Sequence, residues 1–200
     1  MLRVRVDVDA PVVALELREL EVTRPRQDFD GEVAAAEAAA RDDQVARTDR
    51  ARDLYRRFGT DPTKHRPSSE ALLRRVRRGE PLPRINSLVD VANVLSLRLQ
   101  VPVGLYDLEK AKGDELVVRR GEDFEWYEGI RKEWVGLGGR LCVADAEGPC
   151  GNPSSDSART QITTATERAA WIYFLPVSEE WLDRTAELIA RYGRGLVSLV

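Results

Sequence analysis

The chain has 200 residues and a mass of 22.5 kDa, a size at which one domain can bury enough apolar surface without a disulfide or a metal. Hydrophobic residues make up 42% of the sequence and charged residues 32%, which excludes a disordered or fibrous protein. No apolar run reaches the ~20 residues of a membrane-spanning helix. The N-terminus alternates charged and apolar residues and lacks the apolar core of a signal peptide, so we expect a cytoplasmic protein with no membrane partner.

The numbers of cysteine and histidine limit the chemistry. Two cysteines, Cys142 and Cys150, are too few for a disulfide scaffold or for a zinc site made of cysteine alone. The single histidine, His65, lies between two cations, and we expect it on the surface. One histidine also argues against His-rich metal centres and most Ser-His-Asp arrangements. The sequence therefore predicts no metal site and no cofactor, and it leaves open whether the two cysteines pair.

The net charge of −3 is distributed unevenly along the chain. Residues 47–84 hold twelve Lys or Arg against five Asp or Glu, a local net charge of +7, whereas the remainder carries −10. An arginine-rich stretch suits an anionic partner, because a guanidinium group can bind phosphate through two parallel hydrogen bonds. The alternative is a helical surface whose charges only face solvent.

The first sixty residues predict strands followed by a helix. Residues 2–8 alternate apolar and charged side chains, the period of two that indicates a half-buried strand, and this alternation resumes over residues 13–17. Residues 32–54 are rich in Ala, Glu and Arg, which favour a helix, with a break near Asp42 and Asp43.

Two helices are predicted on either side of a proline-containing segment. The first spans residues 68–78, and Ser68 or Ser69 can cap its free amides. The second is capped by Asn86 or Ser87, carries apolar residues at helical spacing, and ends at Pro102.

The second half of the chain predicts short strands separated by glycines, at residues 115–119, 123–126, 140–144 and 170–175. Ser178 then caps a helix over residues 179–192. Strands, helices, strands and a final helix in this order predict an α+β fold, with a mostly antiparallel sheet core flanked by helices.

Four segments form a recognisable pattern: RPSSEALLRRV at residues 66–76, LPRINSLVDVAN at 82–93, PVGLYD at 102–107 and DSARTQIT at 156–163. This pattern resembles the B3/B4 domain of the bacterial phenylalanyl-tRNA synthetase β subunit, and more closely the free-standing proteins built from that domain alone. The resemblance is clearest over residues 66–175. We expect residues 1–200 to form a single B3/B4-like domain, with residues 1–65 as an N-terminal extension integrated with it.

The resemblance implies tRNA binding and a candidate enzymatic activity. In the synthetase, the pocket of this domain hydrolyses tyrosine wrongly esterified to the phenylalanine tRNA. The present chain resembles that domain alone, without an ATP-binding synthetase core, so a complete tRNA ligase is excluded, and the candidate activity is hydrolysis of a mischarged aminoacyl-tRNA in trans. The family's Thr-Asn pair falls on Ala92 and Asn93, and the histidine of its Pro-x-His falls on Gly104, so the catalytic residues are unknown.

Hydrolysis without these groups is chemically feasible. An aminoacyl ester is already activated, so a site that positions a water beside an Asp or Glu would suffice. We expect binding residues in the loop rich in Gly, Pro and Ser that follows a predicted strand, together with the amide carried over from the family. The expected pocket residues are Asn93, Gly104, Asp145, Asp156, Arg159 and Thr160.

Cations of the basic stretch are the expected phosphate contacts, and such contacts weaken steeply with salt. They are Lys64, Arg66, Arg74, Arg75, Arg78 and Arg84. The expected partner is tRNA or an aminoacyl-tRNA, with a synthetase as a further candidate, and the sequence does not indicate the oligomeric state.

Several of these residues also have a structural interpretation. Asn93 can be a buried, satisfied amide, Gly104 can serve a turn that requires a positive φ, and Arg159 can pair with Asp156. The tryptophans at positions 126, 134, 171 and 181 are expected as core or interface anchors rather than as base-stacking platforms.

Two other classes of function remain open. One is a non-catalytic module that binds a small amino-acid-like molecule, which the overall negative charge favours because RNA binders usually present a basic face. The other is an interaction domain that partners a synthetase.

Overall fold

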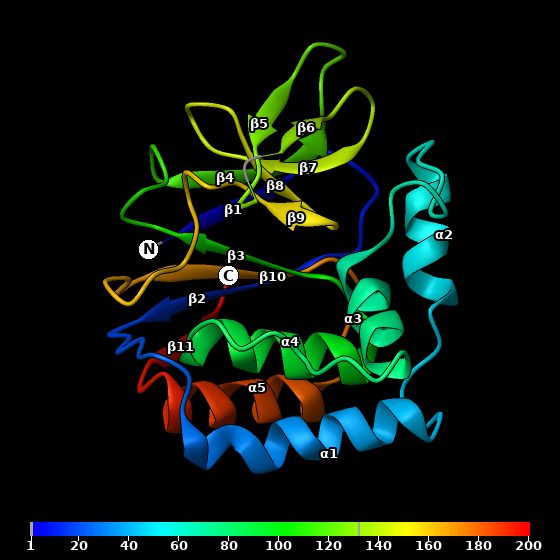
Figure 1. The fold of residues 1–200 in the computed structure, drawn as a ribbon. Helices are drawn as coiled ribbons and strands as arrows, with labels where there is room; N and C mark the ends of the chain where they lie inside the picture. Colours follow the sequence, from blue (N-terminus) through cyan, green and yellow to red (C-terminus); the bar gives the residue numbers. More distant parts are fainter. Residues whose placement is uncertain (1, 132) are drawn as a thin grey trace.

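A central antiparallel sheet organises the molecule. The computed structural model describes residues 2–131 and 133–200 (Figure 1). Strands β2 (Val13–Arg18), β3 (Val103–Asp107), β10 (Ala169–Tyr173) and β11 (Leu196–Leu199) form a sheet in the order β11-β2-β10-β3, called here the β10 sheet. All of its neighbouring pairs are antiparallel. Every residue of β10 is buried, because this strand lies inside the sheet and is covered on both faces.

A second sheet lies above the first in the view of Figure 1. It has the order β1-β4-β7-β8-β9 and is called here the β7 sheet. Its first pair is parallel and the others are antiparallel. The strands are β1 (Arg3–Val6), β4 (Glu115–Arg120), β7 (Leu141–Ala144), β8 (Pro149–Asn152) and β9 (Ser155–Asp156).

A separate hairpin projects from the β7 sheet at the top of Figure 1. It consists of β5 (Trp126–Glu128) and β6 (Trp134–Gly136). Trp126 and Trp134 are exposed and form an edge-to-face pair with ring centroids 4.4 Å apart. Trp171, in contrast, is fully buried in β10, so the expectation of a core role is confirmed for that tryptophan.

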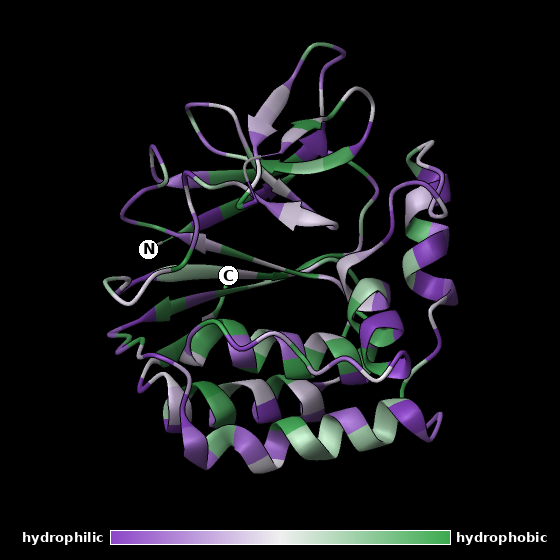
Figure 2. Cartoon of the chain, in the orientation of Figure 1, coloured by the Kyte–Doolittle hydropathy of each residue, from purple (hydrophilic) through white to green (hydrophobic). Residues whose placement is uncertain are grey.

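Helices cover the face of the β10 sheet that is turned away from the β7 sheet. In Figure 1, α4 (Ser87–Leu99) and α5 (Glu179–Tyr192) lie next to this face, and α1 (Asp30–Arg41) packs on α4 after the short 3-10 helix η1 (Gln27–Phe29). Figure 2 shows apolar residues concentrated on α4, which is enclosed on most sides. Within the described residues, no helix combines the length and the apolar character needed to cross a membrane.

Two further helices stand at the edge of this layer. The first, α3 (Ser68–Arg77), packs against α4 and α1, whereas α2 (Asp49–Arg57) is more hydrophilic and lies beside the β7 sheet and its hairpin (Figures 1 and 2). The expected α+β class and the mostly antiparallel sheet are therefore confirmed. The break predicted near Asp42 is also confirmed, because α1 ends at Arg41 and α2 begins at Asp49.

Helix caps were predicted with mixed success. Asn86 caps α4 as expected, since its Oδ1 accepts a hydrogen bond from the Val89 amide at 2.9 Å. The expected cap of α3 is wrong: Pro67 precedes the helix, and the buried Ser69 hydroxyl makes no hydrogen bond with any described residue. Residues 123–126 were expected as a strand, but β5 begins only at Trp126.

Two glycines admit the ring of Tyr106 between the sheets. Tyr106 lies in β3 and is fully buried. A Cβ on Gly104 would stand 2.9 Å from the Cζ of this tyrosine, and one on Gly151 would stand 2.6 Å from its Cε1. Because Gly104 lies in a strand without a positive φ, the interpretation of Gly104 as a turn residue is wrong. Space for the aromatic ring is what requires glycine there.

Replacing Gly104 by Ala should therefore destabilise the protein. The added methyl group would overlap a ring that cannot move freely, a type of overpacking that costs about 1–3 kcal/mol. For a chain of this length, we expect the Tm to fall by about 2–4 °C for each kcal/mol. Gly136→Ala is the matched control, because Gly136 is exposed and a Cβ there meets nothing within 4 Å. Equal melting temperatures of the two variants would contradict this account of Gly104.

Candidate functional site

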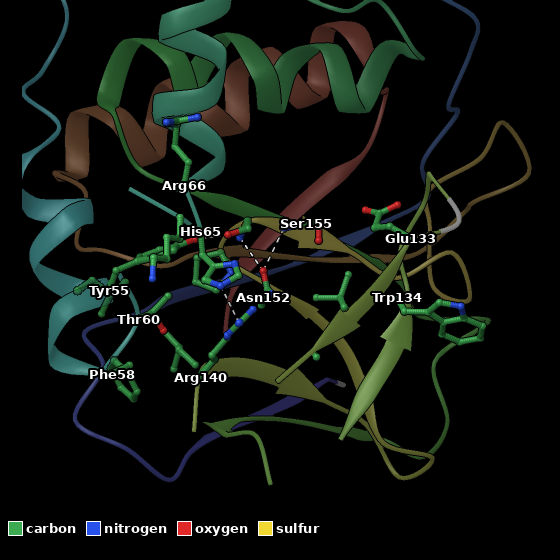
Figure 3. Close-up of a pocket in the computed structure, with 17 residues that line it drawn as sticks. Tyr55, Phe58, Thr60, His65, Arg66, Glu133, Trp134, Arg140, Asn152 and Ser155 are labelled. Atoms are coloured by element: carbon green, nitrogen blue, oxygen red, sulfur yellow. Dashed lines mark hydrogen bonds between the residues drawn. The ribbon is translucent and has the colours of Figure 1, made fainter. Parts of the chain in front are cut away.

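Two adjoining cavities lie on either side of the turn between β8 and β9. The first, called the α4 groove, has a volume of about 450 Å³ and lies between α3, α4, β3 and this turn. The second, called the α2 cavity, has a volume of about 490 Å³ and is bordered by α2, the segment 60–66, β6 and the start of β7 (Figure 3). The two cavities share a wall made of Glu133, Asn152, Ser154 and Ser155.

One face of α4 forms the side of the α4 groove. Val89, Ala92, Asn93 and Ser96 line it, and their spacing of three and four residues places them on the same side of the helix. The Asn93 amide donates a long hydrogen bond to the Pro83 carbonyl at 3.4 Å and remains half-buried. The other walls are largely apolar, with contributions from Leu72, Ile85, Val103, Leu105, Ile130 and Ile162.

Two acidic residues line the groove, the exposed Glu133 of the shared wall and the more deeply placed Asp156. Asp156 Oδ2 accepts a hydrogen bond from the Leu105 amide at 3.3 Å, and Asp156 Oδ1 is buried. Burial raises the pKa of Asp156 to about 7, although the Leu105 amide and the Tyr106 hydroxyl both favour the ionised form. A carboxyl group of this kind can both hold and release a proton near neutral pH.

The Tyr106 hydroxyl lies behind this carboxyl group. A Cβ on Gly151 would stand 2.7 Å from Tyr106 Oη and 2.9 Å from Asp156 Oδ1, so both oxygens lie close to this glycine. Neither has a hydrogen-bond partner of good geometry among the described residues. Burial also holds the pKa of Tyr106 well above its usual value, so the phenol stays protonated. Sequence reasoning missed Tyr106, because an aromatic residue in a buried strand is most often core.

The other expected pocket residues lie outside the α4 groove. Asp145 has a fully buried side chain and makes a double hydrogen bond with Arg159, at 2.7 and 2.9 Å. Burial alone would raise the pKa of Asp145, but Arg159 and backbone amides outweigh burial and lower it. The interpretation of Arg159 as a partner of Asp156 is therefore wrong. Thr160 is buried, and its hydroxyl donates to the Cys150 carbonyl at 3.4 Å.

Of the expected set, the structure thus brings Asn93 and Asp156 together in one groove. Gly104 lies in the strand between two lining residues and supports the wall from behind. Cys142 and Cys150 are both buried and free, so they do not pair with each other. Burial raises the pKa of Cys142 to about 12, which leaves it a protonated packing residue.

The expected RNA-binding cations fall into three groups. Arg74 is exposed on α3, and Arg78 is exposed at the C-terminal cap of this helix, 3.5 Å from Glu80. Arg75 also pairs with Glu80 and donates to the Pro81 carbonyl at 2.6 Å. Lys64 and Arg66 line the α2 cavity instead.

Arg84 has a structural role in the described chain. Its guanidinium group is mostly buried and bonds to Asp90 at 2.7 Å, to Asp30, and to the Arg26 carbonyl. These contacts join the starts of α1 and α4 and use three of its nitrogens. A phosphate contact by Arg84 stays a prediction and would require this network to open.

Comparison with a solved structure defines the class of fold. The chain is similar to an N-terminal fragment of the phenylalanyl-tRNA synthetase β-subunit from Pyrococcus horikoshii, with 14% sequence identity and a TM-score of 0.55. The similarity covers 98% of this chain and 50% of that fragment, so the chain spans about half the length of its structural relative. No curated protein sequence matches significantly.

The family follows from the sequence itself. A family model for the B3/4 domain matches residues 50–176, which is more than half of the chain. The matched range includes α2 except its first residue and all the residues that line the two cavities. The protein therefore belongs to the B3/4 domain family. The resemblance found in the four sequence segments is confirmed.

The raised pKa of Asp156 predicts how stability depends on pH. The stability that the neutral carboxyl group contributes is fully present below about pH 4 and is lost as the pH rises through about 7, because burying the ionised form is costly. Asp156→Asn is always neutral, so its advantage over the natural protein should grow between pH 5 and pH 8, on the order of 2 kcal/mol. Urea unfolding at both pH values measures this difference.

Asp183→Asn is the matched control, because Asp183 is exposed on α5. Its effect on the free energy of unfolding should be small at both pH values. If the free energy of unfolding of Asp156→Asn differs from that of the natural protein by the same amount at pH 8 as at pH 5, the carboxyl group is not a buried acid with a raised pKa.

Proposed function

We propose that this protein binds tRNA and hydrolyses the ester bond of a mischarged aminoacyl-tRNA in trans. The observation that carries the proposal is the position of Asp156, a carboxyl group with a near-neutral pKa in the mostly apolar α4 groove of a B3/4 domain. A general base works best when its pKa lies close to the operating pH. The groove is also of a size that encloses a small ligand.

The groove and its two polar groups support a simple mechanism. The amino-acid side chain enters the apolar part of the groove, and the Asn93 amide contacts the substrate's polar atoms. Ionised Asp156 takes a proton from a water whose oxygen attacks the ester carbonyl carbon. The carbon–oxygen bond to the ribose then breaks, and the ribose oxygen takes the proton that Asp156 had accepted, so the products are the free amino acid and tRNA with a free hydroxyl. No strong nucleophile is needed, because the ester is already activated.

The surface beside the groove supports a nucleic-acid partner. Ser68, Ala71 and Leu72 of α3 line the groove. Arg74 is exposed on the same helix, and Arg78 is exposed at its C-terminal cap. Exposed arginines at the rim of a site attract phosphates by long-range electrostatic steering. The net charge of −3 does not oppose this, because the negative charge resides mainly outside residues 47–84.

Deacylation of a panel of mischarged tRNAs, led by tyrosyl-tRNA(Phe), tests the hydrolysis. We expect release of the amino acid above background, with the rate rising as Asp156 ionises through about pH 7. Asp156→Asn should reduce the rate by about 100-fold or more, the usual contribution of a general base. Asn93→Ala should reduce it as well, whereas Asp183→Asn should leave it unchanged.

Absence of release from every tRNA in the panel would contradict hydrolysis. If free tyrosine or another amino acid then binds the groove saturably and Asn93→Ala weakens that binding, the protein is a non-catalytic binding module.

The tRNA contact is tested with Arg74 of α3 and Arg78 at its C-terminal cap, the two exposed arginines of the expected set in this region. Arg74→Glu combined with Arg78→Glu should weaken tRNA binding by at least about tenfold at low salt and should flatten the salt dependence. Arg75 is left in place because it holds the segment after α3. The control, Arg3→Glu combined with Arg18→Glu, makes the same charge change on exposed residues of β1 and β2. A gel shift in which both double variants bind equally would contradict the α3 contact.

A further inference from the structure

The α2 cavity gathers cations that have little compensating negative charge. Lys64, Arg66 and Arg140 line it, and no described acid forms an ion pair with Lys64 or Arg140 (Figure 3). The acid of the lining is Glu133, which is exposed and belongs to the wall shared with the α4 groove. The net charge of the cavity is therefore positive.

Arg66 lines this cavity, but its guanidinium group is directed away from His65 and Arg140 (Figure 3) and is only loosely paired. Its Nε is buried and has no hydrogen-bond partner among the described residues. The nearest acid is Glu70 at 3.5 Å, and that carboxylate already receives two hydrogen bonds from Arg52, at 2.8 and 2.6 Å. This long contact leaves the positive charge of Arg66 only partly compensated, and that charge adds to the attraction of the cavity for an anion.

Arg140 is held by a neutral group instead of an acid. Its Nη2 lies 2.8 Å from His65 Nε2, and because arginine can only donate, this histidine nitrogen must accept. The proton of His65 is therefore on Nδ1. Burial and the neighbouring arginine lower the pKa of His65 below its usual value. The pair fixes the position of Arg140 while leaving its positive charge uncompensated, an arrangement that suits an incoming anion.

The rest of the wall suits a ligand with an apolar body and hydroxyl groups. Leu54, Tyr55, Phe58 and Leu141 provide apolar and aromatic surface. Hydrogen-bonding groups come from Thr60, Asn152 and Ser154, and the Ser154 hydroxyl lies 2.6 Å from Tyr55 Oη. The volume of about 490 Å³ falls within the roughly 300–1,000 Å³ of typical small-molecule sites. A phosphate joined to a flat base through a sugar has this combination of properties.

We propose that the α2 cavity is a nucleotide-binding subsite, with the phosphate on Arg140 and Lys64, the charge of Arg66 nearby, and the nucleoside against the aromatic wall. In the proposed function, on which this extension of the site rests, the occupant is the terminal nucleotide of the tRNA acceptor end. The amino acid esterified to this nucleotide then lies in the α4 groove, and the ester bond lies next to Ser154 and Ser155, which line both cavities. The nucleotide-binding step itself does not depend on hydrolysis.

Calorimetric titration of the whole protein at low salt with AMP, adenosine and inorganic phosphate tests the subsite. We expect AMP to bind at least about tenfold more tightly than either adenosine or inorganic phosphate. Arg140→Gln should weaken AMP binding by at least about tenfold, and Lys64→Gln, a change at an exposed side chain, should weaken it less. Arg5→Gln is the control, because it removes one exposed charge on β1, away from the cavity.

Equal affinities for AMP and inorganic phosphate, or no binding of AMP, would overturn the subsite. AMP binding that is unchanged in both Arg140→Gln and Lys64→Gln would also overturn it. If Arg140→Gln fails to fold, Lys64→Gln alone decides the test.

The two proposals fail in different ways. AMP binding without deacylation of any tRNA removes the hydrolase and keeps the subsite. Deacylation by a protein that does not bind AMP, with a KM that Arg140→Gln leaves unchanged, keeps the hydrolase and removes the subsite. If both proposals hold, Arg140→Gln should raise the KM for the mischarged tRNA by more than it lowers kcat.

Discussion

The hydrogen bond from the Leu105 amide to the Asp156 carboxylate joins β3 of one sheet to β9 of the other, at the floor of the α4 groove. The contact exists because Gly104 and Gly151 leave room for the Tyr106 ring between the sheets. The same crowding removes water from the carboxyl group and raises its pKa to about 7. The packing that holds the two sheets together therefore also sets the chemistry of the groove.

Arginines with similar sequence surroundings serve different purposes. Arg84 and Arg159 are committed to carboxylates and fix loops, and Arg52 satisfies the buried Glu70. Arg140 is held by a histidine that carries no charge to cancel its own. Breaking one of the buried pairs would leave an isolated charge and destabilise the fold, whereas the cations of the α2 cavity are available to an anion. Burial and partner, rather than residue type, separate structural from functional cations in this chain.

Local patterns in the sequence predicted the elements that depend on neighbouring residues. The two strands at the N-terminus, the break at Asp42 and the cap at Asn86 are all found, although β1 is mostly exposed and β2 is buried on both faces rather than half-buried. What sequence could not show is pairing over long separations: His65 and Arg140 are 75 residues apart, and nothing near either residue indicates their contact. Asp145 and Asp156 lie eleven residues apart in similar surroundings, yet only the tight turn after Asn152 directs one of them into the groove. That choice depends on sheet geometry, which a single sequence does not reveal.

The pairing of β2 has a consequence for how the chain folds. Both of its neighbours in the sheet, β10 and β11, belong to the last 32 residues, and β1 pairs with a strand more than 100 residues further along the chain. During synthesis, the first two strands and the apolar face of α1 therefore remain unpaired until residues much further along the chain have been made. Until then, the edges of these strands can pair with other chains. The two arginines that alternate with valines along β1 keep this unpaired edge charged and discourage wrong pairing.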